Sequence, residues 1–176
     1  MKRLAVALWS GALLAISLHA QAANPTIAEM KSAYTSVKTN LLKLAEKVPE
    51  ADYSFKASPD IRSIGELLQH IAQAQVNYCG RVSGKTTPPD FGSKSKADIV
   101  SALKASFDNC DAAWDSLTDA NLSETAGQGR MAGTKFGMLI RNVVHDNEEY
   151  GYLSVYLRLK GIVPPSSEGG TGRGGR

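Results

Sequence analysis

The chain has 176 residues, a length typical of one ordinary domain and short for two. Hydrophobic residues make up 43% of the sequence and charged residues 21%, which excludes a disordered, collagen-like or polytopic membrane protein. Lys and Arg number 20 against 17 Asp and Glu, and two of these cations are Lys2 and Arg3 at the N-terminus. Because the remaining charge is nearly balanced and is not clustered, we expect no nucleic-acid partner.

The first 22 residues, MKRLAVALWSGALLAISLHAQA, have the three parts of a secretory signal peptide. A short basic start precedes an apolar stretch from Leu4 to Leu18, and Ala20 and Ala22 stand at the two positions that a signal peptidase reads. The alternative is a membrane anchor, but about 15 apolar residues are fewer than the ~20 that span a bilayer. We therefore expect a mature chain that begins at Ala23, without a stable membrane anchor, in the periplasm or secreted.

Cys79 and Cys110 are the two cysteines of the sequence. An oxidising compartment favours a disulfide between them, and the alternative is a pair of independent buried thiols. A metal site at these cysteines is disfavoured, because neither has a second Cys or a His at chelating spacing.

Four segments have the three- and four-residue spacing of apolar side chains that predicts amphipathic helices. They run from about Thr26 to Val48, Ser63 to Val82, Ser95 to Leu117, and Thr134 to Lys160. Ser63 and Glu66 form a capping-box pattern at the start of the second segment. Four such helices predict an all-α four-helix bundle over residues 23–165. Residues 166–176, SSEGGTGRGGR, have a low-complexity composition that predicts a disordered tail.

The fourth segment carries polar residues where the bundle core should lie. Its inward seam is predicted to consist of Met138, Asn142, His145, Glu149, Tyr152 and Tyr156. Glu149 follows His145 by four positions, so the two side chains project from the same helix face. A buried carboxylate is unfavourable unless it is paired or binds a cation. We expect the neighbouring Asp146 and Glu148 to face solvent instead.

The second segment supplies a partner, because His70 lies at the edge of its apolar face. Two imidazoles and one carboxylate that converge inside a bundle can hold a divalent metal and leave coordination positions open. Each histidine taken singly also fits a hydrogen-bonded structural role, so both interpretations stand at this point.

Two stretches resemble a known family. HDNEEYGYLSVYLRLKGIVPPSS resembles the closing motif of the DinB/YfiT-like family, and YSFKASPDIRSIGELLQHIA resembles the segment around its first metal-binding histidine. The likeness extends from Ile27 to Ser167. It implies a bundle of up-down-down-up topology in which three histidines bind one divalent metal. His70 matches the first histidine and His145 the second, while Glu149 stands where the family usually has the third.

The resemblance implies a divalent metal ion (zinc, nickel, iron or manganese) held by His70, His145 and Glu149. Relatives of this kind include thiol-dependent transferases, so we expect a metal-dependent thiol transferase or hydrolase that acts on a small molecule. The alternative is a non-catalytic ligand-binding or stress-related bundle with a degenerate metal site, which the carboxylate at position 149 favours. The catalytic residues and the substrate are not predicted, and a homodimer is left open.

Overall fold

The computed structural model describes residues 24–169, so the predicted signal peptide lies outside the described residues. Four helices form the body of the molecule: α1 (Pro25–Lys47), α2 (Ile64–Ser83), α3 (Lys96–Asp115) and α4 (Lys135–Leu159). These bounds agree with the sequence prediction to within about two residues at each end, the usual uncertainty of helix termini.

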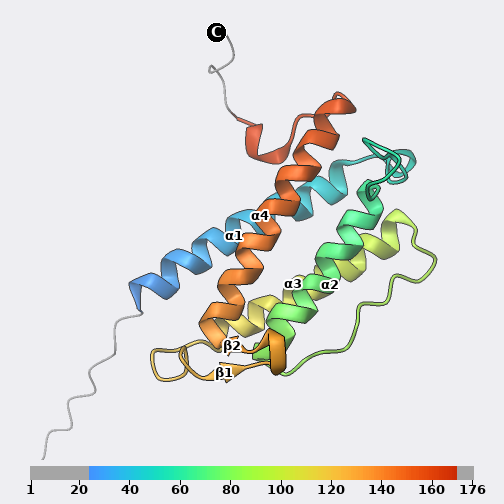
Figure 1. Ribbon diagram of the computed structural model, residues 1–176. Helices are drawn as coiled ribbons and strands as arrows, with labels where there is room; N and C mark the ends of the chain where they lie inside the picture. The colour runs from blue at the N-terminus through green and yellow to red at the C-terminus, as the bar shows by residue number, and fades with distance from the viewer. Residues whose placement is uncertain (1–23, 170–176) are drawn as a thin grey trace, which may run out of the picture.

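The helices form a bundle in which α2 and α3 run in the same direction and α1 and α4 run opposite to them (Figure 1). The predicted up-down-down-up topology is therefore present. A parallel pair needs a long return connection, and the segment between α2 and α3 (residues 84–95) supplies it along the outside of the bundle. Helix α2 packs against α3 and α4, and α1 packs against the same two helices on the other side.

The helix starts follow from local side-chain hydrogen bonds. Ser63 accepts from the N–H of Glu66, and the Glu66 carboxylate accepts from the N–H of Ser63 at 2.7 Å, which is the predicted capping box. Asn24, Ser95 and Thr134 cap the other three helices in the same way, each accepting from amides that have no partner inside their helix. The capping box thereby fixes the start of α2 at Ile64, six residues before His70.

The bundle interior is filled by aromatic and aliphatic side chains, with the disulfide between Cys79 and Cys110 at the contact of α2 and α3. The largest fully buried side chains include Trp114, Tyr34 and Phe107. The rings of Tyr34 and Trp114 stack with centroids 5.7 Å apart, joining α1 to α3. Among residues 24–169, no helix combines the length and the hydropathy that a membrane span requires.

Short 3-10 helices lie in two of the connections, η1 (Glu50–Asp52) between α1 and α2 and η2 (Gly129–Met131) between α3 and α4, and η3 (Pro165–Ser167) follows α4. A small antiparallel ladder of β1 (Thr125–Ala126) and β2 (Gly133–Thr134) brackets η2 before α4. Strands of two residues are too short to show alternation of apolar and polar side chains, so the sequence pattern does not predict them.

The bundle ends later than the composition predicts. Residues 166–169, which we expected to be disordered, follow a defined path in which the Tyr150 hydroxyl donates to the Ser166 hydroxyl at 2.9 Å and Lys47 pairs with Glu168. The serines that make this segment look low in complexity belong to η3 (Pro165–Ser167), which contacts α1 and is hydrogen-bonded to Tyr150 of α4. The remainder of the predicted tail lies outside the described residues.

A pair of helical glycines tests the packing of α2. A Cβ atom on Gly80 would lie 2.4 Å from the backbone oxygen of Lys85, whereas a Cβ on Gly151 in α4 would meet no atom within 4 Å. We expect Gly80→Ala to lower the free energy of unfolding by roughly 1–3 kcal/mol, because the chain after α2 must shift. Gly151→Ala should instead stabilise by up to about 1 kcal/mol. Urea unfolding of both variants checks this, and equal stabilities would contradict the close approach.

Candidate metal centre

The three predicted ligands meet between α2 and α4. The Nε2 atoms of His70 and His145 are 3.1 Å apart, and Glu149 Oε1 lies 3.4 Å from the first and 3.7 Å from the second. One donor atom from each residue thus lies within 4.8 Å of the other two. His145 and Glu149 are one turn apart on α4, and His70 faces them from α2, so the bundle itself creates the cluster.

These separations fit one metal ion. With metal–ligand bonds near ~2.1 Å, two donors are about 3.4 Å apart in a tetrahedral site and about 3.0 Å apart in an octahedral one. The three donor–donor distances of 3.1, 3.4 and 3.7 Å lie close to these values. Two imidazoles and a carboxylate are also a donor set that binds zinc, iron(II), manganese or nickel and leaves positions open.

Two buried atoms of the cluster lack partners. Glu149 Oε2 and His145 Nδ1 form no hydrogen bond with any residue of the described part of the chain. The nearest carboxylate to His145 Nδ1 is Asp146 Oδ1, 3.6 Å away and just outside hydrogen-bonding distance. A buried carboxylate oxygen without a donor is unfavourable, and coordination to a cation would remove that penalty.

The electrostatic environment differs among the three groups. Burial lowers the pKa of His70, and the positive charge of Arg62 lowers it further. Burial would also lower the pKa of His145, but the carboxylates of Asp146 and Glu149 outweigh it and raise this pKa. Burial raises the pKa of Glu149, against the attraction of His145 and Arg62. A dication in the cluster would favour the neutral imidazoles and the ionised carboxylate together.

Asp146 is fully buried. This corrects the expectation from its spacing that it faces solvent. Its two oxygens accept hydrogen bonds of 2.9 and 2.8 Å from Gln75 Nε2, and Gln75 Oε1 accepts in turn from Asn142. Helix α4 packs against both α1 and α2, so it buries a wider arc than one seam and takes Asp146 inside. Glu148 is exposed, as predicted.

The hydrogen-bonded residues Asp146, Gln75 and Asn142 connect the candidate metal ligands to the disulfide. The Gln75 oxygen lies against the Cys110 sulfur, and Asn142 Oδ1 lies 3.5 Å from the sulfur of Cys79. Sequence reasoning placed Asn142 on the inner seam but missed Gln75 and Asp146 as a hydrogen-bonded pair. The available signal was a glutamine on the apolar face of the second helix, which must find a partner when buried.

The family model that describes sequences of the DinB superfamily matches residues 33–152, well over half of the chain. The chain belongs to the DinB superfamily. Its structure is similar to that of a DinB-like protein from Bacillus cereus, with a TM-score of 0.63 and 19% identity over 79% of this chain and 95% of that one. A DinB-like protein from Bacillus subtilis gives a TM-score of 0.63 and 22% identity over 77% of this chain and 93% of that one. Comparison with curated proteins found no match.

At these identities the two structures support the DinB fold and not a shared activity. The predicted four-helix architecture is confirmed by them together with the helices described above. Any inference about the activity of this DinB chain must therefore rest on its own residues, above all on the carboxylate of Glu149 beside His70 and His145.

Tyr152 does not lie on the inner seam of the DinB bundle, where we had expected it. It is 51% exposed, and its hydroxyl donates to Glu148. Tyr156 is buried as expected, and its hydroxyl donates to the backbone oxygen of Arg62 at 2.8 Å. The seam turns away from Tyr152 because an α-helix advances about 100° per residue, so a strict seven-residue spacing drifts around the helix.

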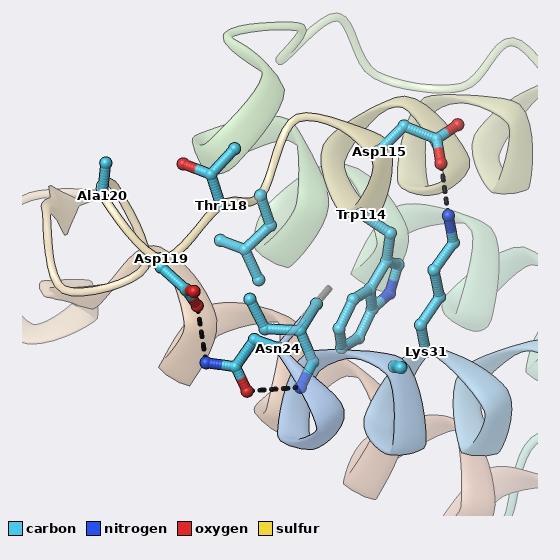
Figure 2. Close-up of a pocket in the computed structure, with 10 residues that line it drawn as sticks. Asn24, Lys31, Trp114, Asp115, Thr118, Asp119 and Ala120 are labelled. Atoms are coloured by element: carbon cyan, nitrogen blue, oxygen red, sulfur yellow. Dashed lines mark hydrogen bonds and ion pairs between the residues drawn. The ribbon is translucent and has the colours of Figure 1, made fainter. Parts of the chain in front are cut away.

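A separate hollow of about 720 Å³ lies between the beginning of α1 and the end of α3 (Figure 2). Trp114 reaches into it from α3, and ion-paired Lys31 and Asp115 border it. None of the candidate metal ligands lines this hollow. The candidate centre instead adjoins a groove of about 710 Å³ that Glu149 borders from α4.

Asp146 provides a test of how the centre is supported. Replacing it with alanine leaves the buried Gln75 amide without its acceptors, so Asp146→Ala should lower the free energy of unfolding by about 1–3 kcal/mol. Loss of the carboxylate nearest His145 should also weaken metal affinity roughly ten- to a hundredfold. The control is Glu148→Ala on the exposed face, which should change stability by less than about 0.5 kcal/mol. Chemical denaturation and metal titration measure both quantities for the two variants. If Asp146→Ala and Glu148→Ala had equal effects, Asp146 would have no supporting role.

Proposed function

We propose that this DinB protein binds one divalent metal ion through His70, His145 and Glu149 and uses it to activate a small molecule. The observation that carries the proposal is the convergence of three donor atoms within 4.8 Å, with the buried Glu149 Oε2 left without a partner. The two imidazoles and one carboxylate fix three positions, and the remaining positions are available to water or a ligand.

Solvent reaches the centre next to His70, because the His70 side chain is 34% exposed, compared with 16% for His145 and 8% for Glu149. A divalent ion held there lowers the pKa of a coordinated water or thiol and so supplies a nucleophile at neutral pH. The chain's own residues bind the ion, and Asp146 lies where it can orient the His145 ring. This chemistry supports a metal-dependent hydrolase or thiol transferase.

We also propose that the protein is exported. Residues 1–22 have the pattern of a cleaved signal peptide, and the disulfide between Cys79 and Cys110 is a feature of oxidising compartments. The intact mass of protein recovered from the periplasm of an expressing bacterium should correspond to a chain that begins at Ala23. An uncut chain found in the cytoplasm would contradict export. Because small thiols are mainly cytoplasmic, export favours hydrolysis over thiol transfer.

Cobalt(II) provides a direct test of an open metal centre. Added to the metal-free mature protein, it should give visible absorption bands that change when a small thiol such as mercaptoethanol is added. A panel of ester, amide and thiol-conjugation substrates, assayed with and without a chelator, then distinguishes hydrolysis from thiol transfer. Unchanged bands on adding the thiol, together with no chelator-sensitive turnover, would contradict an activating role.

A second candidate function is a non-catalytic ligand-binding bundle. One observation favours it: Glu149 Oε1 lies within ion-pair distance of both histidines, so a protonated imidazole would satisfy that oxygen without a metal. Under this alternative the purified chain contains no stoichiometric metal, and its ligand affinity is the same with and without a chelator.

A further inference from the structure

The groove beside the candidate centre has an apolar lining and opens to solvent. It lies between the segment that precedes α2 and the second half of α4. Its apolar and aromatic walls come from Ile61, Leu67, Tyr152, Val155 and Tyr156. Glu149 borders the same groove, so any molecule that fills it lies next to the metal candidates.

Several of these wall residues are more exposed than large apolar side chains usually are. Ile61 is 42% exposed, Tyr152 51% and Val155 56%. Tyr152 and Val155 are three positions apart on α4, so they lie on one face of the helix, and Ile61 from the segment before α2 lines the same groove. A continuous exposed apolar surface that also borders polar site residues is typical of a ligand-binding groove.

Arg62 lines this groove and is exposed. Within residues 24–169 it takes part in none of the ion pairs that the other charged side chains form, and the pair nearest to it in sequence joins Lys56 to Glu66. Its backbone is held in place, because the Tyr156 hydroxyl donates to its carbonyl oxygen and the next residue, Ser63, caps α2. The groove therefore presents a guanidinium without an ion-pair partner in the described part of the chain, on a backbone that is held in place close to the metal candidates.

The charge around the groove favours an anion of low charge. With a divalent ion bound by Glu149, the excess charge of the centre is positive, and Arg62 adds to it. Asp60 also lines the groove and opposes a second negative charge on the ligand. A guanidinium pairs with a carboxylate through two parallel hydrogen bonds, which suits a monoanionic head group.

We propose that the groove binds a small monocarboxylate with an apolar or aromatic body, whose carboxylate pairs with Arg62. The apolar body lies against Ile61, Tyr152 and Val155, and this arrangement places the ligand beside Glu149. The inference rests on the proposed function, since it names the class of molecule that is brought to the metal centre. Arg62 is a specificity-determining residue in this arrangement and does not hold the metal.

The test uses the mature protein with zinc added, phenylbutyrate as the probe, and phenylbutanol as the neutral analogue. Calorimetric titration should show phenylbutyrate binding at least about tenfold more tightly than phenylbutanol, a difference of ~1.4 kcal/mol. Arg62→Gln should remove this preference, whereas Arg130→Gln, at an exposed arginine in η2, should leave it unchanged. Val155→Asp should weaken both probes, because it places a charge on the apolar wall.

The zinc content of each sample separates this inference from the proposed function. If zinc binds and phenylbutyrate is no tighter than phenylbutanol, or Arg62→Gln keeps the preference, the inference is wrong and the metal proposal stands. If zinc does not bind, the metal proposal fails, and Arg62-dependent binding of phenylbutyrate to the metal-free chain decides the inference alone. Tighter binding of phenylbutyl phosphate than of phenylbutyrate would overturn the monocarboxylate. So would a dimer that covers this face, excludes the probe and is dissociated by Val155→Asp.

Discussion

Replacing His145 with alanine should abolish stoichiometric binding of a divalent metal ion. His145 contributes one of the three converging donors and is the ligand flanked by both Glu149 and Asp146. The loss of affinity should exceed the ~10–100-fold that follows from changes next to the ligands, because a donor itself is removed. Metal at 100 times its dissociation constant stabilises a folded protein by about 2.7 kcal/mol, and this increment should be absent in the variant.

The matched variants sharpen this prediction. Glu149→His gives the centre three imidazoles, a donor set that binds zinc in its own right, so it should keep or tighten metal binding. Asn147→Ala, at an exposed position two residues further along α4, should bind metal like the wild type. Titration with zinc, monitored by calorimetry, measures all three. Full zinc binding by His145→Ala would show that the cluster is not the metal site.

Removal of the disulfide should have the largest effect on stability. Cys79 and Cys110 are 31 residues apart. Without the bridge the unfolded chain regains the conformational entropy that closing a loop of this size removes, which lowers the free energy of unfolding by about 3–4 kcal/mol. For a domain of this length the midpoint of thermal unfolding should fall by roughly 10 °C. The double variant Cys79→Ala/Cys110→Ala, compared with the wild type by urea and thermal unfolding, tests this value.

Reduced wild-type protein is the control for the disulfide prediction. It retains both sulfur atoms in the core, so it separates the loss of the cross-link from the loss of packed volume. Its stability should fall by most of the same amount. If reduction leaves the unfolding transition unchanged, or alkylation of the denatured, unreduced protein labels both cysteines, the bridge does not stabilise the chain.

The helices were predictable because their signals are local. The capping box of Ser63 and Glu66 and the apolar spacing along each segment depend on residues within a turn or two of one another. The spacing of His145 and Glu149 is local in the same way, and it placed both side chains on one face. Their meeting with His70 depended on the bundle topology, which the sequence indicated through the family resemblance.

The errors concern features that depend on which helices become neighbours. The burial of Asp146 follows from the contact of α4 with two helices at once, and the contact of Gln75 with Asp146 joins residues 71 positions apart. The groove beside Glu149 combines the segment before α2 with the second half of α4, so no single stretch of sequence contains it. The path of residues 166–169 depends on the hydroxyl of Tyr150, which composition cannot show.

The metal content of the mature wild-type protein is the most direct test of the account. The protein should be purified without chelators, incubated in turn with zinc, nickel, manganese and iron(II), dialysed, and measured by inductively coupled plasma mass spectrometry. We expect about one equivalent of at least one of these metals per chain, and close to none in a parallel sample of His145→Ala. A wild type that retains none of the four metals would show that His70, His145 and Glu149 form a hydrogen-bonded cluster and not a metal centre.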